Sequence, residues 1–186
     1  EWMTGLGVLY VNKHLPEVDQ VMYINADKFT PADSLYIPTG EIKSVEGTPM
    51  DFRTPTEIGK KVDYSFDQIK NATGYDHNWC LNTYKDGKGD DKTVCASLYS
   101  PKSGILLEVF TNEPGIQVYT GNFQGTGIAC KHGIKYPKHV SVCFESQKYP
   151  DSPTKIAQGV KGWTDATLKP GEKYYSHLAY KFSVKK

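Results

Sequence analysis

Short runs of β-branched and aromatic residues, separated by Gly and Pro, recur along the chain. Runs of this length and composition predict an all-β sandwich or barrel. The segments expected to form strands are 21–25, 94–99, 105–110, 117–120, 140–145 and 174–182. Residues 100–104 join two of them, and Gly104 suits the left-handed position of a hairpin connection. No helical period persists over three turns, although 63–71 has room for one or two turns of helix.

Two connections between these runs are long, namely 30–55 and 149–170. Loops of that length in a compact domain usually carry function or are disordered. The acidic segment 86–91 lacks the alternating ligands and terminal Glu of an EF-hand, so it predicts a polar hairpin turn. No repeat or low-complexity linker interrupts the chain, and we expect a single domain over residues 1–186.

Composition excludes several classes of partner. The chain has 186 residues, enough to bury a sizeable core, and 22 Lys+Arg balance 21 Asp+Glu to a net charge of +1. That balance provides no field for nucleic acid or a membrane surface, and we expect neither as a partner. No apolar run approaches the ~20 residues of a membrane span. We expect a cytoplasmic protein, with a periplasmic or secreted one left open.

Metal and redox motifs are also missing. The four cysteines, at 80, 95, 130 and 143, show no C-x-x-C pairing. Free thiols packed in the core are the first interpretation, and one or two disulfides are the alternative. His77, His132 and His139 have no metal-ligand spacing. There is no G-x-S-x-G elbow, P-loop or dinucleotide-binding fingerprint.

Three polar and aromatic clusters remain as candidates for a site. They lie at 74–79, at 111–122 and at 144–147, where Glu145 ends an apolar run. Carboxylates and amides bind sugar hydroxyls, and flat rings pack against the apolar face of a pyranose. The residues alone leave two interpretations open: a sugar site, or ordinary turn residues.

Matching segments in the right order resemble the aldose 1-epimerase (galactose mutarotase) family. They are 25–33, 37–42, 47–53, 74–78, 98–104, 113–122, 145–151 and 168–172, and the match runs from about Asp19 to the C-terminus. Together they are far more specific than any one motif. The resemblance implies an antiparallel β-sandwich of the galactose mutarotase-like supersandwich type, with an open sugar cleft.

The resemblance also implies a reaction and its residues. Such enzymes interconvert the α and β anomers of a free hexose, such as galactose or glucose, by acid–base ring opening. The base is the Glu of an E-[ST]-Q motif, here Glu145. The Asp of Y-D-H-N and the Gln of P-G-x-Q line the cleft, here Asp76 and Gln117, and we add His77 to the expected substrate-binding residues. The family implies no metal and no organic cofactor.

The departures from the family pattern lie at the start of the chain. The family's acid is a His in N-H-x-Y-F-N, and the nearest match, residues 7–12, has Val8 at that position. His14 is six residues away. An upstream half with an Asn-Arg pair and a further His has no counterpart. We therefore expect the C-terminal portion of the fold, with an atypical start at 1–18 and weak or no turnover.

Two alternative functions follow from those departures. One is a non-catalytic carbohydrate-binding module that keeps Asp76, Gln117 and Glu145. The other is a fragment completed by a partner chain or a second copy, because the exposed edges of a truncated sheet favour self-association.

Overall fold

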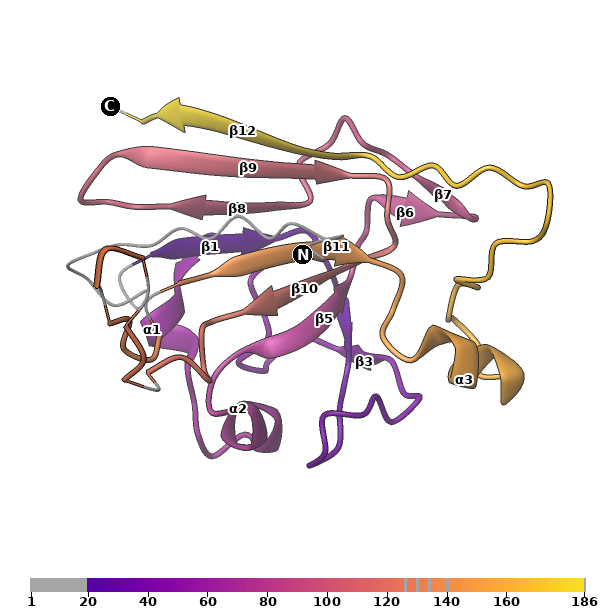
Figure 1. The fold of residues 1–186 in the computed structure, drawn as a ribbon, viewed down its shortest axis with the longest axis horizontal. Coiled ribbons are helices and arrows are strands. Elements are labelled where there is room, and N and C mark those ends of the chain that lie inside the picture. The colour runs from indigo at the N-terminus through magenta and orange to yellow at the C-terminus, as the bar shows by residue number, and fades with distance from the viewer. Residues whose placement is uncertain (1–19, 126, 130, 134, 140, 186) are drawn as a thin grey trace.

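Two five-stranded antiparallel sheets stack into a sandwich in the computed structural model, as Figure 1 shows. The structure describes residues 20–125, 127–129, 131–133, 135–139 and 141–185. The first sheet has the order β12 (Leu178–Val184), β9 (Ile105–Thr111), β8 (Ala96–Tyr99), β1 (Val21–Ile24), β4 (Thr56–Glu57). The second has the order β11 (Cys143–Gln147), β10 (Gly115–Tyr119), β5 (Asp76–Cys80), β2 (Lys28–Thr30), β3 (Lys43–Ser44). These sheets confirm the all-β prediction.

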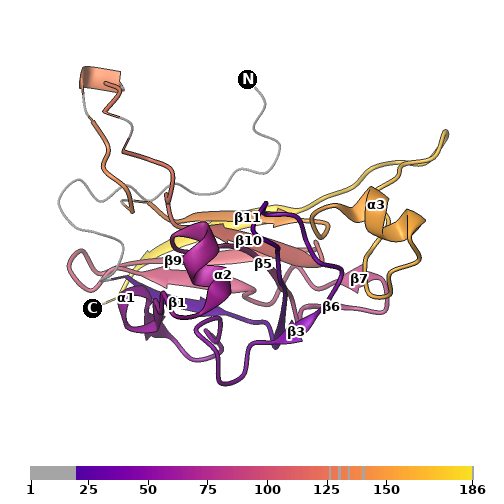
Figure 2. The same cartoon turned by 90° about the horizontal axis from the view of Figure 1, so that it is seen from below.

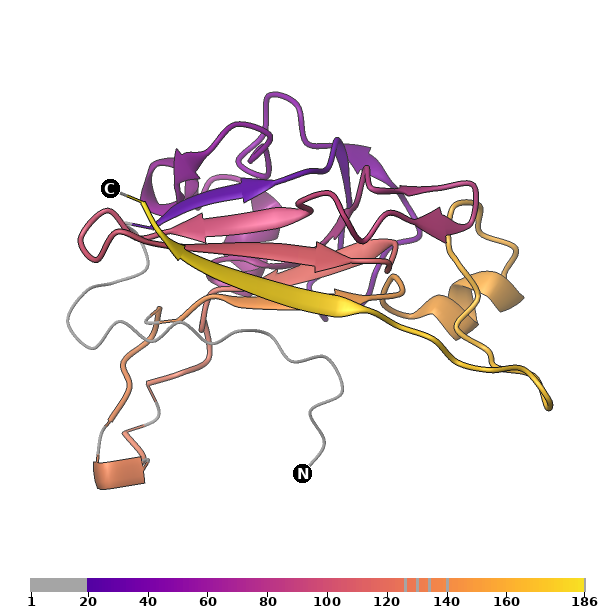
Figure 3. The same cartoon turned by 90° about the horizontal axis from the view of Figure 1, so that it is seen from above.

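Short elements connect the strands. They are the hairpin of β6 (Tyr84–Lys85) and β7 (Lys88–Gly89), the helices α1 (Ile58–Lys61), α2 (Asp67–Ala72) and α3 (Ser152–Ala157), and the 3₁₀ turn η2 (Lys131–Gly133). Figures 2 and 3 show that the described part of the β10–β11 connection projects away from the two sheets and carries η2. No helix in the described residues has the length and apolar character to cross a membrane.

The core lies between the sheets and follows the two-residue period of their strands. In the first sheet, alternate residues such as Met22 and Ile24 are fully buried. In the second, Trp79, Val118 and Phe144 point inward and pack in the same cluster. Because neighbours along a strand point to opposite faces, the outward face of the second sheet carries the intervening, mostly polar side chains.

Most of the predicted strands are present. Strands β1, β8, β9, β10, β11 and β12 fall on or overlap the six expected segments. Gly104 has a φ of 73°, as the hairpin prediction requires, and Asp86 and Gly87 form the tip of the β6–β7 hairpin with φ of 51° and 78°. The left-handed tip confirms that residues 86–91 include a hairpin turn.

The sequence did not predict β5, the central strand of the second sheet. Four of its five residues are buried. One face meets the core, and on the other Asn78 is hydrogen-bonded to polar neighbours while Cys80 packs with Tyr149 and Trp163. Such a strand shows no alternation of apolar and polar residues, so the sequence lacks the two-residue period by which a strand is recognised. Strands β2, β3 and β4 were missed because each has only two or three residues.

The thiols that the structure describes are free. Cys80 and Cys95 are buried and Cys143 is half-buried, in agreement with the first interpretation for these three. Cys130 lies outside the described residues, as do residues 1–18 with Val8 and His14.

Candidate functional site

The polar residues singled out by sequence meet on the outward face of the second sheet. Gln117 of β10 pairs with Asn78 of β5 on one side and with Glu145 of β11 on the other. Residues directly opposite on paired strands share a face. Asp76 precedes Asn78 by two residues and therefore shares that face as well. Cross-strand register thus brings Asp76, Gln117 and Glu145 together from three separate segments of the chain.

A chain of hydrogen bonds links the amides on this face. The Gln117 Nε2 donates to Asp76 Oδ1 at 2.8 Å. The Gln147 Nε2 donates to Gln117 Oε1 at 3.3 Å and to Asn78 Oδ1 at 3.4 Å. The Asn78 Nδ2 in turn donates to Thr30 Oγ1 at 3.3 Å. Thr30, Asn78 and Gln147 all lie in segments that resemble the family, but the sequence analysis gave none of them a role.

The turn before β5 fixes the point at which the strand begins, and therefore the position of Asp76. The Asn122 Nδ2 donates to the carbonyl oxygen of Tyr75 at 2.9 Å, and the Tyr75 N–H donates to Thr120 Oγ1 at 3.0 Å. Gly74 has a φ of 147°, and a Cβ there would overlap the Asn122 side chain. The turn therefore needs glycine both for its backbone conformation and for space.

The two carboxylates are electrostatically coupled. Burial raises the pKa of Asp76, and the hydrogen bond from Gln117 partly offsets that shift. Burial also raises the pKa of Glu145, with a further contribution from the negative charge of Asp76. Within the described residues no hydrogen bond reaches the Glu145 carboxylate, whereas Asp76 is held by an amide. The two carboxylates therefore differ in their surroundings, because an amide holds Asp76 Oδ1 and no described hydrogen bond fixes Glu145.

His77 lies on the other face of β5. Its side chain is buried, and its ring meets the Trp79 ring edge-on at 6.5 Å. Its Nδ1 accepts a hydrogen bond from the Asp76 N–H at 3.1 Å, and burial lowers its pKa to about 4. The geometry favours a role for neutral His77 in supporting the Asp76 backbone. His77 also borders the cavity described next, so its direct sugar contact stays a prediction.

A cavity of about 250 Å³ opens over the Asp76 end of the site. Its lining comes from β2, β5, β10 and two long connections: Thr30, Ala32, Tyr36, Pro38, Asp76, His77, Asn78, Gln117 and Pro150. The long connection 30–55 thus supplies part of the wall. Glu145 does not line this cavity but lies on the next strand, opposite Gln117.

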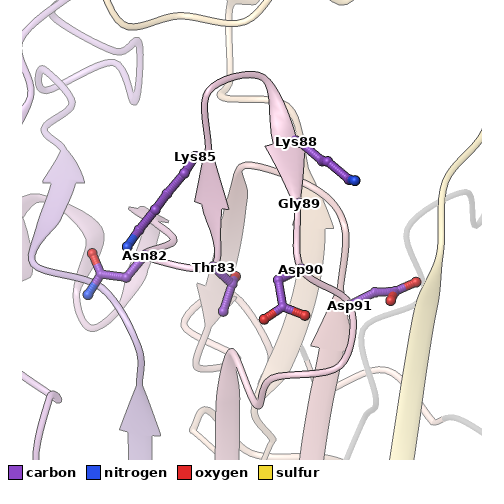
Figure 4. Close-up of a pocket in the computed structure, with 7 residues that line it drawn as sticks. All are labelled: Asn82, Thr83, Lys85, Lys88, Gly89, Asp90 and Asp91. Atoms are coloured by element: carbon purple, nitrogen blue, oxygen red, sulfur yellow. The ribbon is translucent and has the colours of Figure 1, made fainter.

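A larger cavity, about 470 Å³, lies at the β6–β7 hairpin (Figure 4). Its two lysines, Lys85 and Lys88, point to opposite sides of the hairpin. The Asp90 Oδ2 accepts a hydrogen bond from the Thr93 hydroxyl at 2.6 Å, and Asp91 lies 2.9 Å from His177 Nδ1. The labelled side chains around this larger cavity point in different directions, whereas a binding site combines an enclosed space with a few converging polar groups. The smaller cavity, which is lined by Asp76 and Gln117, is therefore the better candidate for a binding site.

The described part of the chain shows no metal site. It contains no group of three or more His, Cys, Asp or Glu residues that could hold an ion.

Known proteins match this chain over most of its length. The family model described as aldose 1-epimerase matches residues 12–181. The chain is 42% identical over 166 residues to galactose mutarotase of Bos taurus, covering 89% of this chain and 44% of that protein. It is 36% identical over 163 residues to aldose 1-epimerase of Escherichia coli K12, covering 87% of this chain and 44% of that protein.

A solved structure agrees with these matches. The fold is similar to galactose 1-epimerase from Lactobacillus acidophilus NCFM, with a TM-score of 0.73 and 27% identity over 92% of this chain and 46% of that one. The chain therefore spans slightly less than half the length of these relatives.

Proposed function

Because the chain belongs to the aldose 1-epimerase family, we propose that it binds a free hexose on the outward face of the second sheet and takes part in interconverting the sugar's α and β anomers. One observation carries the proposal. Asp76, Gln117 and Glu145, the residues that the family resemblance selects, are half-buried and lie together on neighbouring strands of one outward sheet face. They combine a fixed hydroxyl-binding pair with an available carboxylate.

Glu145 acts as the base in this proposal. It takes the proton from the anomeric hydroxyl, the ring opens, the C1–C2 bond rotates, and closure on the other face returns the proton. Its raised pKa, caused by burial and the Asp76 charge, makes Glu145 a stronger base than an exposed carboxylate. The ring oxygen needs a proton from an acid on the other side of the sugar. In the family pattern that acid is a His, and the position that matches it here is Val8, which has no proton to donate and lies outside the described residues.

Asp76 and Gln117 hold hydroxyl groups of the sugar. The Asp76 carboxylate accepts hydrogen bonds, and its Oδ1 is already fixed by the Gln117 amide at 2.8 Å. A bound hexose would bridge from this pair toward Glu145. The pair therefore supports the reaction by fixing the anomeric centre relative to the base, which lowers the entropy cost of the proton transfer.

A carbohydrate-binding module without turnover is the second candidate. The observation that favours it is the position of Glu145, which is outside the 250 Å³ cavity and on the edge strand β11 of the described sheet. An edge strand also offers unpaired backbone groups to another chain, which supports the proposal of self-association.

Three measurements on the purified chain separate these functions. Calorimetric titration with galactose and glucose tests binding, and polarimetry tests conversion above the spontaneous rate. Light scattering on a sizing column gives the mass of the assembly. Binding and conversion together, both weakened in Asp76→Ala, support the epimerase proposal. Binding without conversion favours the module, and absence of binding to either sugar contradicts both.

A further inference from the structure

We infer that Asn78 and Gln147 are positioning residues whose amides, anchored on Thr30, fix the orientation of the Gln117 amide and through it the carboxylate of Asp76. These five side chains are called the amide relay below. The role of the relay in sugar binding rests on the proposed function, whereas its effect on Asp76 can be measured without sugar.

The direction of each amide follows from its neighbours. Because Gln147 donates to Gln117 Oε1, the Gln117 Nε2 is turned toward Asp76. A flipped Gln117 would place its oxygen against the Asp76 carboxylate and its N–H groups against those of Gln147. Both contacts would be repulsive, so only one orientation satisfies the relay.

The Thr30 end of the relay is almost fully buried, at the floor of the 250 Å³ cavity. Asn78 is 1% exposed and Thr30 is 3% exposed, so water has little access to replace a lost partner. Buried polar groups at such positions are costly to leave unpaired, and a fully paired network is rigid. The Asn78 amide is therefore held in one orientation, and its Oδ1 is a fixed acceptor for the Gln147 amide.

Gly115 supplies the space that the relay occupies. A Cβ at this position would overlap Asn78 Oδ1 and approach the Tyr149 ring to 2.9 Å. The φ of Gly115 is not in the left-handed region, so the backbone alone does not require glycine there. Glycine inside a strand often marks such a close approach. The prediction is that Gly115→Ala disturbs the relay without straining the backbone.

The relay should be visible in the ionisation of Asp76. An N–H donated to a carboxylate favours its charged form and so lowers its pKa. Loss of the Gln117 hydrogen bond should raise the pKa of Asp76 further. The titratable groups near Asp76 are His77 on β5, Tyr119 on β10, and Cys143 and Glu145 on β11, and the relay variants replace none of them.

The test follows the Asp76 carboxyl carbon by NMR in the sugar-free chain as pH is varied. Gln147→Met keeps the length of the side chain and removes its hydrogen bonds, and Thr30→Val removes the anchor. In both, Asp76 should titrate at a higher pH than in the wild type. Thr30→Ser keeps the hydroxyl and should restore the wild-type titration, a rescue that a purely steric role would not predict.

The matched control is Ser146→Ala, on the same strand as Gln147 but on its opposite face. It should leave the Asp76 titration unchanged. In sugar titrations, Gln147→Met should weaken galactose binding about tenfold, because an unpaired buried polar group typically costs about that much. The control should bind like the wild type.

The outcomes are distinguishable. A folded Gln147→Met and a folded Thr30→Val that both keep the wild-type Asp76 titration overturn the relay, whatever happens to binding. A shifted Asp76 titration in a chain that binds no hexose supports the relay and contradicts the proposed function. If Gln147→Met does not fold, the Thr30→Val and Thr30→Ser pair decides the question alone.

Discussion

Replacing Glu145 by Gln separates catalysis from folding. The side chain keeps its size, but it can no longer take a proton from the anomeric hydroxyl. A positioned base is typically worth ~10²–10⁴-fold, or about 2.7–5.5 kcal/mol of barrier. We expect Glu145→Gln to lose this much of the conversion rate above the spontaneous rate.

The stability of the same variant should not fall. Folding raises the pKa of Glu145, so this group stabilises the fold fully below its unfolded pKa, and that contribution is lost as pH rises through the folded pKa. Gln cannot ionise and keeps the contribution. Glu145→Gln should therefore match the wild type at low pH and be equally or slightly more stable at neutral pH. The difference should stay within about 0.5 kcal/mol, since no described hydrogen bond is removed.

The assay is polarimetry of fresh α-galactose, with exchange NMR between the anomers as a second readout, alongside urea unfolding at two pH values. Ser146→Ala, on the buried side of the same strand, is the control for local disturbance. A folded Glu145→Gln that converts galactose at nearly the wild-type rate would refute the assignment of the base. A marked loss of stability at neutral pH would refute the electrostatic reasoning.

Three further predictions concern other residues. Asp76→Ala leaves the Gln117 amide and the sugar hydroxyls without an acceptor. Calorimetry should show galactose binding weakened by about 1–3 kcal/mol, while the melting temperature changes little. Unchanged affinity would contradict the site. The His77 ring should not titrate between pH 5 and 8 in NMR spectra, because burial lowers its pKa to about 4; a midpoint near 6.5 would show that the ring is hydrated. Lys148→Met should destabilise the fold by about 3 kcal/mol in urea unfolding, because the buried Glu113 carboxylate loses the ammonium group that lies 2.9 Å away. Adding Glu113→Gln should recover most of the loss. No recovery would mean that Lys148 acts through packing alone.

Local pattern determined several elements of this protein. Runs of β-branched and aromatic residues located β1, β8, β9 and β12, because strands that are apolar on at least one face keep a readable composition. Gly104 has the positive φ that turn chemistry predicted for the last residue of the connection between β8 and β9. The candidate residues Asp76, Gln117 and Glu145 were also named from sequence: composition marked the three clusters that contain them, and the family's motif pattern gave each residue its expected role.

The tertiary structure decided how those residues relate to one another. Strand β5 is covered on both faces, so no alternation revealed it, and the side that each residue faces follows only once the strand is known. The alternation of side chains along β5 placed Asp76 on the outward face of the second sheet and His77 on the core side.

Non-local pairing then determined the site. Register across β5, β10 and β11 set Gln117 between Asn78 and Glu145, and it brought Thr30 from a strand almost fifty residues earlier to hold Asn78. The raised pKa values of Asp76 and Glu145 also come from the burial that this packing creates. Composition and spacing are properties of neighbours along the chain, whereas register and burial depend on which strands meet, and this is the physical reason why only the folded structure shows them.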